Sequence, residues 1–500
     1  MEFIFDVEWI AGITEIYLLF VINVLLIYSV VYATSASYQY PILLKNITWL
    51  SILVLVFALS LNLLNPLTGC IIFNNLLIID SFGIIIKSII LLATICILIS
   101  SINHNRAENQ NSIEYLILVI LSCTGMIILI SSYDLIILYL AIEFQSFCLY
   151  IMAALKRTSE FSTEAGLKYF ILGAFSSGLI LFGCSLIYGF TGTTNFQQLF
   201  QIFSVSIFLE PSVIFLHCEN AIVAGIIFIL VGLLFKLSAV PFHIWAPDVY
   251  EGSPTSITAF FAFVPKISIL ALFVRFLCYV SYVFLLPWQQ IIVISSIGSM
   301  LLGTLGAIYQ IKIKRLLAYS AIGHVGYMLV GLSCGSIQGI SATFFYVSVY
   351  MLMTLSIFII LLSFIDSKNS NNLKFLNDLS GIAHSNKLLA ISFSVLLFSM
   401  SGVPPLVGFF SKMFIFVSAI NSGMFFLAVF GILINVIACF YYIRLIKIMC
   451  FEVPNISLSY KMDREKSIIL GILTIFLSTF FLWPSSLIIS LHNAVLLLCL

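Results

Sequence analysis

Long, nearly uninterrupted runs of apolar residues, separated by short polar stretches, fill almost the whole chain. A helix that crosses the hydrocarbon core of a bilayer needs about 20 predominantly apolar residues. The pattern therefore predicts an all-α polytopic membrane protein with about fourteen transmembrane helices. Their expected limits are 14–35, 42–65, 78–101, 113–132, 135–155, 166–190, 221–245, 255–283, 287–310, 318–335, 337–365, 387–420, 425–448 and 467–490.

The composition leaves no room for a soluble fold of this length. Hydrophobic residues make up 62% of the 500 residues. Only 8% are charged, against roughly 25% in an average soluble domain. These values exclude a soluble enzyme, a nucleic-acid-binding protein and a disordered chain, and the net charge of +1 predicts no nucleic-acid partner.

Basic residues gather in the loops that follow odd-numbered spans. Basic loops remain on the side of the membrane where the chain is made, so these loops should face the cytoplasm or the mitochondrial matrix. Both termini should then face the opposite side. The odd loops hold 14 of the 21 basic residues, and the even loops and terminal tails hold none. The 14 residues are Arg106, Lys156, Arg157, Lys312, Lys314, Arg315, Lys368, Lys374, Lys387, Arg444, Lys447, Lys461, Arg464 and Lys466.

The chain carries no pattern typical of a targeting peptide, a metal site or a nucleotide site. The first ten residues hold three acids and no base, unlike a secretory signal or a transit peptide, which favours synthesis in a bacterium or an organelle. The 11 cysteines are scattered, with no CxxC, and no Walker A or glycine-rich dinucleotide fingerprint occurs. We therefore expect no cofactor on this chain and expect any redox chemistry to take place in other chains.

Among the charged residues inside predicted spans, four stand out: Glu143, Lys236, Lys266 and Lys412. A charge at mid-bilayer costs about 2.5–3.5 kcal/mol on insertion scales, and such residues usually face the bundle interior and mark ion pathways. Tyr139, Ser146 and Tyr150 fall on the same helical face as Glu143. Burial disfavours the charged form of a lysine, so such a group can release and retake a proton. The alternatives are a static hydrogen-bonded glutamate and lysines whose amino groups extend to the membrane surface.

Prolines predict two broken helices, numbers 7 and 12. Pro241 follows Lys236, and Pro404 and Pro405 precede Lys412. Proline removes a backbone donor and clashes with the preceding turn of a helix. Two broken helices at matching positions of the chain suggest an internal repeat, with an ion path at the breaks. Two buried histidines are candidate relay residues, although each could equally be a hydrogen-bonded core residue. They are His243 and His324.

Four segments, YLAIEFQSF, LLFKLSAVPFHIWAPDVYEGSPT, KRLLAYSAIGHVGY and GVPPLVGFFSKMF, resemble the antiporter-like membrane subunits of NADH:ubiquinone oxidoreductase, respiratory complex I. The resemblance covers most of the chain and is most specific from 133 to 450. It implies two inverted five-helix repeats, spans 4–8 and 9–13. The implied divisions are an N-terminal three-helix segment at 1–110, repeats at 111–285 and 286–450, and a C-terminal helix at 451–500.

The resemblance also implies proton translocation, coupled to electron transfer from NADH to ubiquinone in other subunits. By motif, Glu143 matches the family's span-5 glutamate, which forms an ion pair with the span-7 lysine, here Lys236. Lys266 matches the connecting lysine of span 8, and Lys412 matches the lysine of broken span 12. NADH, FMN, iron–sulfur clusters and ubiquinone would be bound elsewhere in the complex. The expected partners are other membrane-arm subunits, including a neighbouring antiporter-like subunit, and lipids. The expected location is the mitochondrial inner membrane, with both termini on the intermembrane-space side.

Three alternatives remain. The chain could be a component of a stand-alone multi-subunit cation/proton antiporter, which would depend on Na⁺ gradients and lack NADH dehydrogenase partners. It could be a structural spacer in the complex that does not pump, or it could come from a plastid or bacterial complex. Lys87, inside the third span, departs from the family's pattern, and we expect it to be solvated or paired locally.

Overall fold

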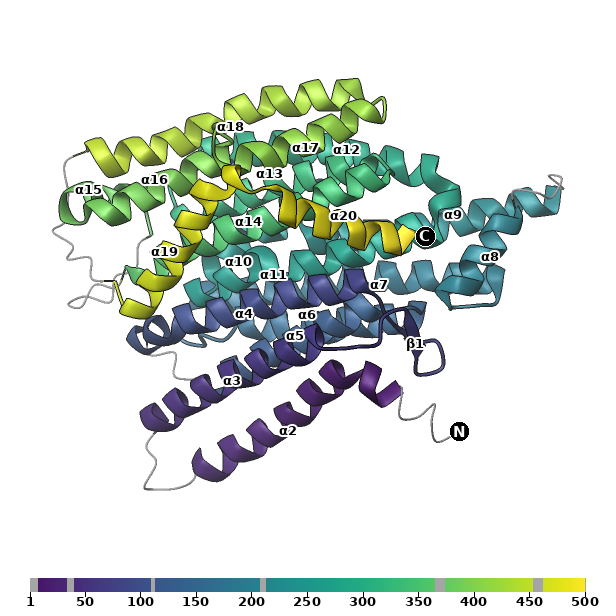
Figure 1. Ribbon diagram of the computed structural model, residues 1–500, viewed down its shortest axis with the longest axis horizontal. Coiled ribbons are helices and arrows are strands. Elements are labelled where there is room, and N and C mark those ends of the chain that lie inside the picture. The colour runs from purple at the N-terminus through teal and green to yellow at the C-terminus, as the bar shows by residue number, and fades with distance from the viewer. Residues whose placement is uncertain are drawn as a thin grey trace.

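Long helices lie side by side through most of the molecule in the computed structural model (Figure 1). The structure describes residues 8–33, 40–108, 113–206, 213–364, 374–452 and 462–499. The expected boundary between 110 and 111, with Lys368 and Lys461, lies outside these residues.

The long helices reproduce most of the predicted spans. The first half contains α2 (Ile13–Ala33), α3 (Tyr40–Leu63), α4 (Ser81–Ala107), α5 (Ile113–Ser131), α6 (Leu135–Ala153), α7 (Glu160–Thr191), α9 (Val213–Leu237), α10 (Trp245–Gly252) and α11 (Thr255–Val274). The second half contains α12 (Leu285–Ile308), α13 (Ile313–Ser333), α14 (Ile337–Ser363), α15 (Ile382–Ser385), α16 (Lys387–Ser401), α17 (Val407–Asn421), α18 (Phe425–Phe451), α19 (Arg464–Thr479) and α20 (Ser485–Cys499).

The prediction of about fourteen spans is confirmed, with one correction at the C-terminus. Within the described residues, thirteen helices are long and apolar enough to cross a membrane, and α16 with α17 form one more, broken span. The last predicted span, 467–490, is wrong in extent, because α19 ends at Thr479 and α20 begins only at Ser485. Pro484 lies between them, and proline disfavours a helical conformation in the residue that precedes it.

Two small elements connect spans without crossing the bundle. A hairpin joins β1 (Cys70–Ile72) to β2 (Leu77–Ile79), with Cys70 opposite Ile79. The helix α8 (Phe196–Ser206) follows α7. Both elements are too short to span a bilayer, so the pattern of long apolar runs does not predict them.

Glycines allow neighbouring helices to approach closely. A methyl group on Gly232 of α9 would lie 2.3 Å from the Ile180 side chain of α7, and one on Gly183 of α7 would lie 2.6 Å from the Gly225 carbonyl of α9. Small residues at such crossings are typical of membrane helices, whose association depends on close packing because lipid tails are as apolar as the side chains.

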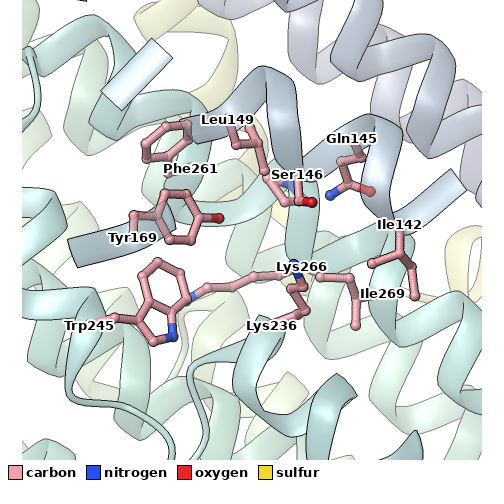
Figure 2. Close-up of a pocket in the computed structure, with 11 residues that line it drawn as sticks. Ile142, Gln145, Ser146, Leu149, Tyr169, Lys236, Trp245, Phe261, Lys266 and Ile269 are labelled. Atoms are coloured by element: carbon pink, nitrogen blue, oxygen red, sulfur yellow. The ribbon is translucent and has the colours of Figure 1, made fainter. Parts of the chain in front are cut away.

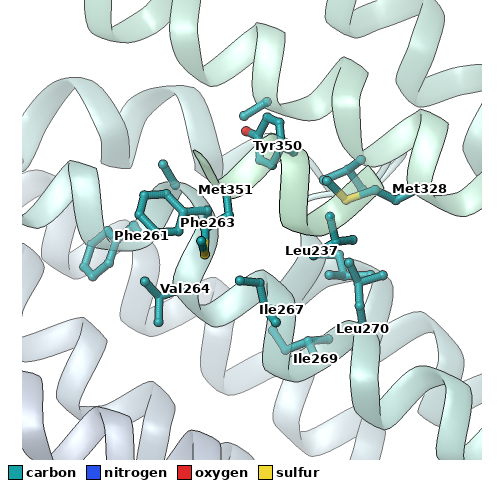
Figure 3. Packing of buried hydrophobic residues seen from close by; sticks show 14 of the residues in the cluster. Leu237, Phe261, Phe263, Val264, Ile267, Ile269, Leu270, Met328, Tyr350 and Met351 are labelled. Atoms are coloured by element: carbon teal, nitrogen blue, oxygen red, sulfur yellow. The ribbon is translucent and has the colours of Figure 1, made fainter. Parts of the chain in front are cut away.

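Helix α11 forms the centre of the bundle. All of its residues are buried. Figure 3 shows its side chains, Phe263, Ile267 and Leu270 among them, packed with Met328 of α13 and Met351 of α14. A helix that is apolar on every face and fully enclosed by protein provides a rigid support for the one charged group in its middle, Lys266.

Polar contacts at both ends of α4 join the N-terminal helices to α11. At one end, Arg275 donates two hydrogen bonds to the Asp80 carboxylate, at 2.9 and 2.8 Å. At the other end, the Thr255 hydroxyl lies 2.8 Å from Nε2 of His104. Arg275 therefore has a structural partner, and α4 cannot shift along α11 without breaking a bidentate ion pair.

The start of α2 and the end of α20 lie toward the same end of the bundle (Figure 1). An even number of spans requires this arrangement.

Candidate functional site

The chain breaks helix 7 immediately after Lys236. Helix α9 ends at Leu237, Ser238 adopts a left-handed conformation with φ of 63°, and α10 begins at Trp245. The last carbonyls of a helix have no partner within the helix. The Trp245 indole donates to the Phe235 carbonyl at 2.9 Å and satisfies one of them. The predicted break is confirmed, and its free carbonyls are bound by side chains that follow it.

Lys236 lies in the last turn of α9, with 7% of its surface exposed. Its amino group donates to the Tyr150 hydroxyl at 2.9 Å and lies 5.4 Å from the centre of that ring. Gly173 of α7 leaves room for this hydroxyl, since a methyl group there would lie 2.1 Å from it. A glycine on a third helix therefore provides the space that the hydrogen-bond acceptor of Lys236 occupies.

Glu143 does not form the predicted direct ion pair with Lys236. Within the described residues, no ion pair joins them, and Oε1 of Glu143 is buried without a hydrogen-bond partner. Tyr150 lies seven residues after Glu143 on α6, about two turns along the same face. The lysine bonds to this hydroxyl, while the residue Glu143 as a whole stays half-buried at the edge of the bundle.

Lys266 follows Pro265 in the middle of α11. Proline cannot donate to the carbonyl four residues before it, that of Phe261. The Tyr250 hydroxyl of α10 donates to this carbonyl at 3.2 Å and places its ring 5.9 Å from the Lys266 amino group. That amino group is buried and makes no hydrogen bond to the described part of the chain.

Lys236 and Lys266 line one small cavity (Figure 2). Its volume is about 20 Å³, which is enough for one water molecule. Gln145 and Ser146 of α6 contribute polar groups to its wall, and Tyr169 and Trp245 close one side. The two lysines therefore share a space in which a single water could bridge them.

The predicted break in helix 12 is also confirmed. Helix α16 ends at Ser401, Gly402 adopts φ of 85°, and α17 begins at Val407. The Lys412 amino group donates to the carbonyls of Met400 at 2.8 Å and Ser401 at 3.2 Å. A buried ammonium thus binds the carbonyls that the break leaves without helical partners.

Asn435 of α18 completes the site around Lys412. Its Oδ1 accepts a hydrogen bond from the amino group at 2.6 Å, and the ring centre of Tyr327 lies 5.2 Å away. All of these acceptors are neutral, so they stabilise the charged form of Lys412 less strongly than a carboxylate would.

Replacing Asn435 with leucine is expected to slow proton translocation by about tenfold in the assembled complex. A hydrogen bond to a charged group contributes about 1.5–3 kcal/mol, and its loss disfavours the protonated form of Lys412. The measurement is the initial rate of acidification of vesicles that hold the purified complex. The control is Asn23→Leu, because the Asn23 side chain is exposed and, among the described residues, donates to the Leu19 carbonyl of its own helix. Equal rates in both variants would contradict a role for Asn435.

His324 lies between two tyrosine hydroxyls. Its Nδ1 is 2.5 Å from the Tyr346 hydroxyl of α14, and its Nε2 is 3.0 Å from the Tyr442 hydroxyl of α18. The ring of Tyr327 lies between His324 and Lys412, with its centre 6.2 Å from that of the His324 ring and 5.2 Å from the Lys412 amino group. A histidine with a hydroxyl at each nitrogen can accept a proton on one side and donate one on the other.

His243 is not brought into this arrangement. It lies half-buried within the break of helix 7, and its Nδ1 makes no hydrogen bond to the described residues. It neither lines the cavity of Lys236 and Lys266 nor bonds to Lys236. Its relay role remains a prediction.

The acids of the WAPDVYEG segment fasten α10 to the helices around it. Asp248 accepts from Lys168 of α7 and from Arg315 of α13, each at 3.0 Å. Glu251 forms ion pairs with Arg315 and with Lys312. These ion pairs fix the far side of the break in helix 7. Among the described residues, no group of three or more histidines, cysteines, aspartates or glutamates is arranged to hold a metal ion.

Three polar partners were missed by the sequence analysis: Asn435, Tyr346 and Tyr442. Each bonds to a predicted residue more than 20 positions away in the chain. Helical spacing places Tyr150 on the face of Glu143, but nothing in the sequence pairs it with Lys236.

Comparisons with known proteins agree on one family. The family described as NADH:quinone oxidoreductase/Mrp antiporter, TM, matches residues 132–438. The chain is 48% identical to NADH-ubiquinone oxidoreductase chain 2 of Marchantia polymorpha, over 99% of this chain and all of that protein. It is 44% identical to NADH-quinone oxidoreductase subunit N of Rhodospirillum rubrum, over 84% of each chain.

Solved structures show the same fold. A chain of respiratory complex I from Thermus thermophilus with bound Aureothin superposes with a TM-score of 0.78 at 26% identity, over 96% of this chain and 99% of that chain. A chain of the Mrp complex from Dietzia superposes with a TM-score of 0.81, over 97% of this chain and 98% of that one, but at 17% identity this likeness concerns the fold alone. The chain therefore belongs to the antiporter-like membrane subunits of NADH:quinone oxidoreductase, in the group named NADH-ubiquinone oxidoreductase chain 2.

Proposed function

We propose that this chain translocates protons across the mitochondrial inner membrane as a subunit of NADH:ubiquinone oxidoreductase. The observation that carries the proposal is the placement of three buried lysines: Lys236 and Lys412 beside the breaks in helices 7 and 12, and Lys266 directly after Pro265 in the middle of α11. Such charges are costly in a membrane and have no evident task in packing.

The first step takes place at Lys236. Its amino group donates to the Tyr150 hydroxyl, and Glu143 lies about two turns before Tyr150 on the same face of α6. Glu143 is half-buried at the edge of the bundle, so a charge in a neighbouring antiporter-like subunit can attract it or screen it. When the field of Glu143 at Lys236 weakens, the ammonium form is disfavoured and the proton leaves.

The proton then passes to Lys266 through the shared cavity, which can hold a bridging water. From Lys266 it moves toward His324 and its two tyrosine hydroxyls, and then to Lys412 at the second break. Only neutral acceptors hold Lys412, and so this residue can release the proton toward the far side of the membrane.

Electron transfer belongs to other subunits of the complex, which bind NADH, FMN, iron–sulfur clusters and ubiquinone. This chain contributes residues that carry protons and binds no redox group. Its neighbours are other membrane-arm subunits and lipids.

In this proposal the odd loops, rich in lysine and arginine, face the matrix, and both termini face the intermembrane space. The segment 111–285 forms one antiporter-like repeat and 286–450 the second, inverted one. The N-terminal segment 1–110 and the C-terminal segment 451–500 support them.

Native electrophoresis tests the assignment. Gently solubilised membranes are separated, stained for NADH oxidation, and searched for this chain by mass spectrometry. The expected result is co-migration with a large NADH-oxidising band whose proton translocation is independent of Na⁺. Migration in a small assembly that exchanges Na⁺ for protons would instead support the stand-alone antiporter. Co-migration with the NADH-oxidising band, together with normal pumping in variants of Lys236, Lys266 and Lys412, would indicate a structural spacer.

A further inference from the structure

A pocket on the odd-loop side of the molecule lies away from the buried lysines. Its volume is about 410 Å³, within the usual range for a small-molecule site. Five connections form its wall, and each follows an odd-numbered span. The charged side chains that line it are Lys156, Lys312, Lys314, Lys374, Glu108 and Glu251.

The charges of the pocket do not cancel. Lys312 is paired with Glu251, and Lys156 lies 3.9 Å from Glu108. Lys314 donates to the Ser253 carbonyl at 2.8 Å and forms no ion pair with the described residues. Lys374 is exposed, and no described residue forms an ion pair with it. Two positive charges therefore remain without a carboxylate of their own.

Helix N-termini add to this positive field. Helices α11 and α13 begin directly after Pro254 and Lys312, which line the pocket, and neither of these cap residues bonds to its helix through a side chain. The first N–H group of α13, that of Ile313, donates to the Lys374 carbonyl at 3.1 Å, and those that follow it remain. The N-terminus of a helix carries a partial positive charge and free backbone N–H groups, which favour a phosphate. Lysines and helix ends thus act in the same direction on an anion.

The rim of the pocket is apolar. Phe161 is 68% exposed and Phe375 is 46% exposed, and both line the opening. The pocket lies where the spanning helices end, at the level of lipid headgroups. A basic pocket between transmembrane helices on the matrix side, bordered by exposed aromatic rings, suits a molecule with a phosphate and acyl chains.

We propose that this pocket binds the phosphate of an anionic phospholipid. The phosphate lies among Lys156, Lys314 and Lys374, and the acyl chains extend past Phe161 along the outer face of α7. Bound there, the lipid joins five connections that otherwise meet through ion pairs and a few hydrogen bonds. This proposal does not depend on proton translocation.

The test uses the whole purified complex and a photoactivatable phosphatidylglycerol. Cross-linked peptides are identified by mass spectrometry, and labelling of 156–161, 251–254 and 374–375 is measured against probe concentration. In the double variant Lys156→Gln/Lys374→Gln, half-maximal labelling should require about thirtyfold more probe, because each lysine near a lipid surface contributes about 1 kcal/mol to binding. The control is Lys387→Gln, an exposed lysine that does not line the pocket and should leave labelling unchanged.

Two further measurements test whether labelling depends on the charge of the lipid and whether the bound phosphate belongs to a lipid or is free. A photoactivatable phosphatidylcholine, which has no net charge, should label the pocket weakly and without sensitivity to the double variant. Equal labelling by both probes, or labelling unaffected by the double variant, would overturn the proposal. Radiolabelled inorganic phosphate is also added to the delipidated complex. The lipid assignment would be overturned in favour of free phosphate if this phosphate bound, prevented labelling by the lipid probe and no longer bound the double variant, and if no phospholipid co-purified at this position.

Discussion

Replacing Lys236 with alanine is expected to lower NADH-driven proton translocation by about a hundredfold, within the range that a positioned proton-transfer group usually contributes. The variant removes the ammonium that donates to Tyr150 and empties one wall of the cavity shared with Lys266. No described carboxylate bonds to Lys236, so its loss leaves no directly paired buried charge, and assembly should persist. The measurements are NADH:ubiquinone turnover and acidification of proteoliposomes.

Two variants distinguish the effect of the positive charge of Lys236 from the effect of its proton release. Lys236→Arg keeps a positive charge that proteins do not deprotonate, so it should assemble normally and still fail to pump. Tyr150→Phe keeps the ring and removes the acceptor hydroxyl, so it should slow pumping less than the loss of Lys236. Lys387→Ala, on the exposed surface, serves as the control. Normal turnover with a normal ratio of protons to electrons in Lys236→Ala would refute the mechanism.

The spans and breaks could be predicted because they depend on local chemistry. An apolar run of about 20 residues has few stable alternatives to a membrane helix, since every backbone group must bond within the segment. Pro241 and the pair Pro404 and Pro405 mark the breaks for an equally local reason. The division after Thr479 was missed, because the surrounding run is apolar enough to conceal the effect of a single proline at position 484.

The buried lysines could also be predicted, whereas their partners could not. A charge within an apolar run is visible in the sequence, and Lys236, Lys266 and Lys412 are all buried as expected. The acceptors depend on tertiary packing. Asn435 reaches Lys412 from another helix, and Tyr150 binds Lys236 where the sequence predicted a direct pair with Glu143.

Lys87 illustrates the same limit in the N-terminal helices. The expectation that it is solvated or paired locally is wrong, because it is 2% exposed and bonds to Glu15, 72 positions away, at 2.5 Å. The Glu15 carboxylate also accepts from Ser131 at 3.0 Å and from Thr14 at 2.5 Å. Helices α2, α4 and α5 therefore meet at one buried ion pair with its hydrogen bonds satisfied.

Lys87→Met is expected to destabilise the attachment of these helices by about 3–5 kcal/mol, the usual cost of leaving one partner of a buried ion pair uncompensated. The double variant Lys87→Met/Glu15→Leu should recover most of this loss, because replacing both charges with apolar groups is often neutral or stabilising. The measurement is the midpoint of thermal dissociation of this chain from the purified complex, with the exposed Lys45→Met as the control. If the double variant were as unstable as the single one, then shape rather than charge would hold these three helices together, and the ion pair would need a task other than attachment.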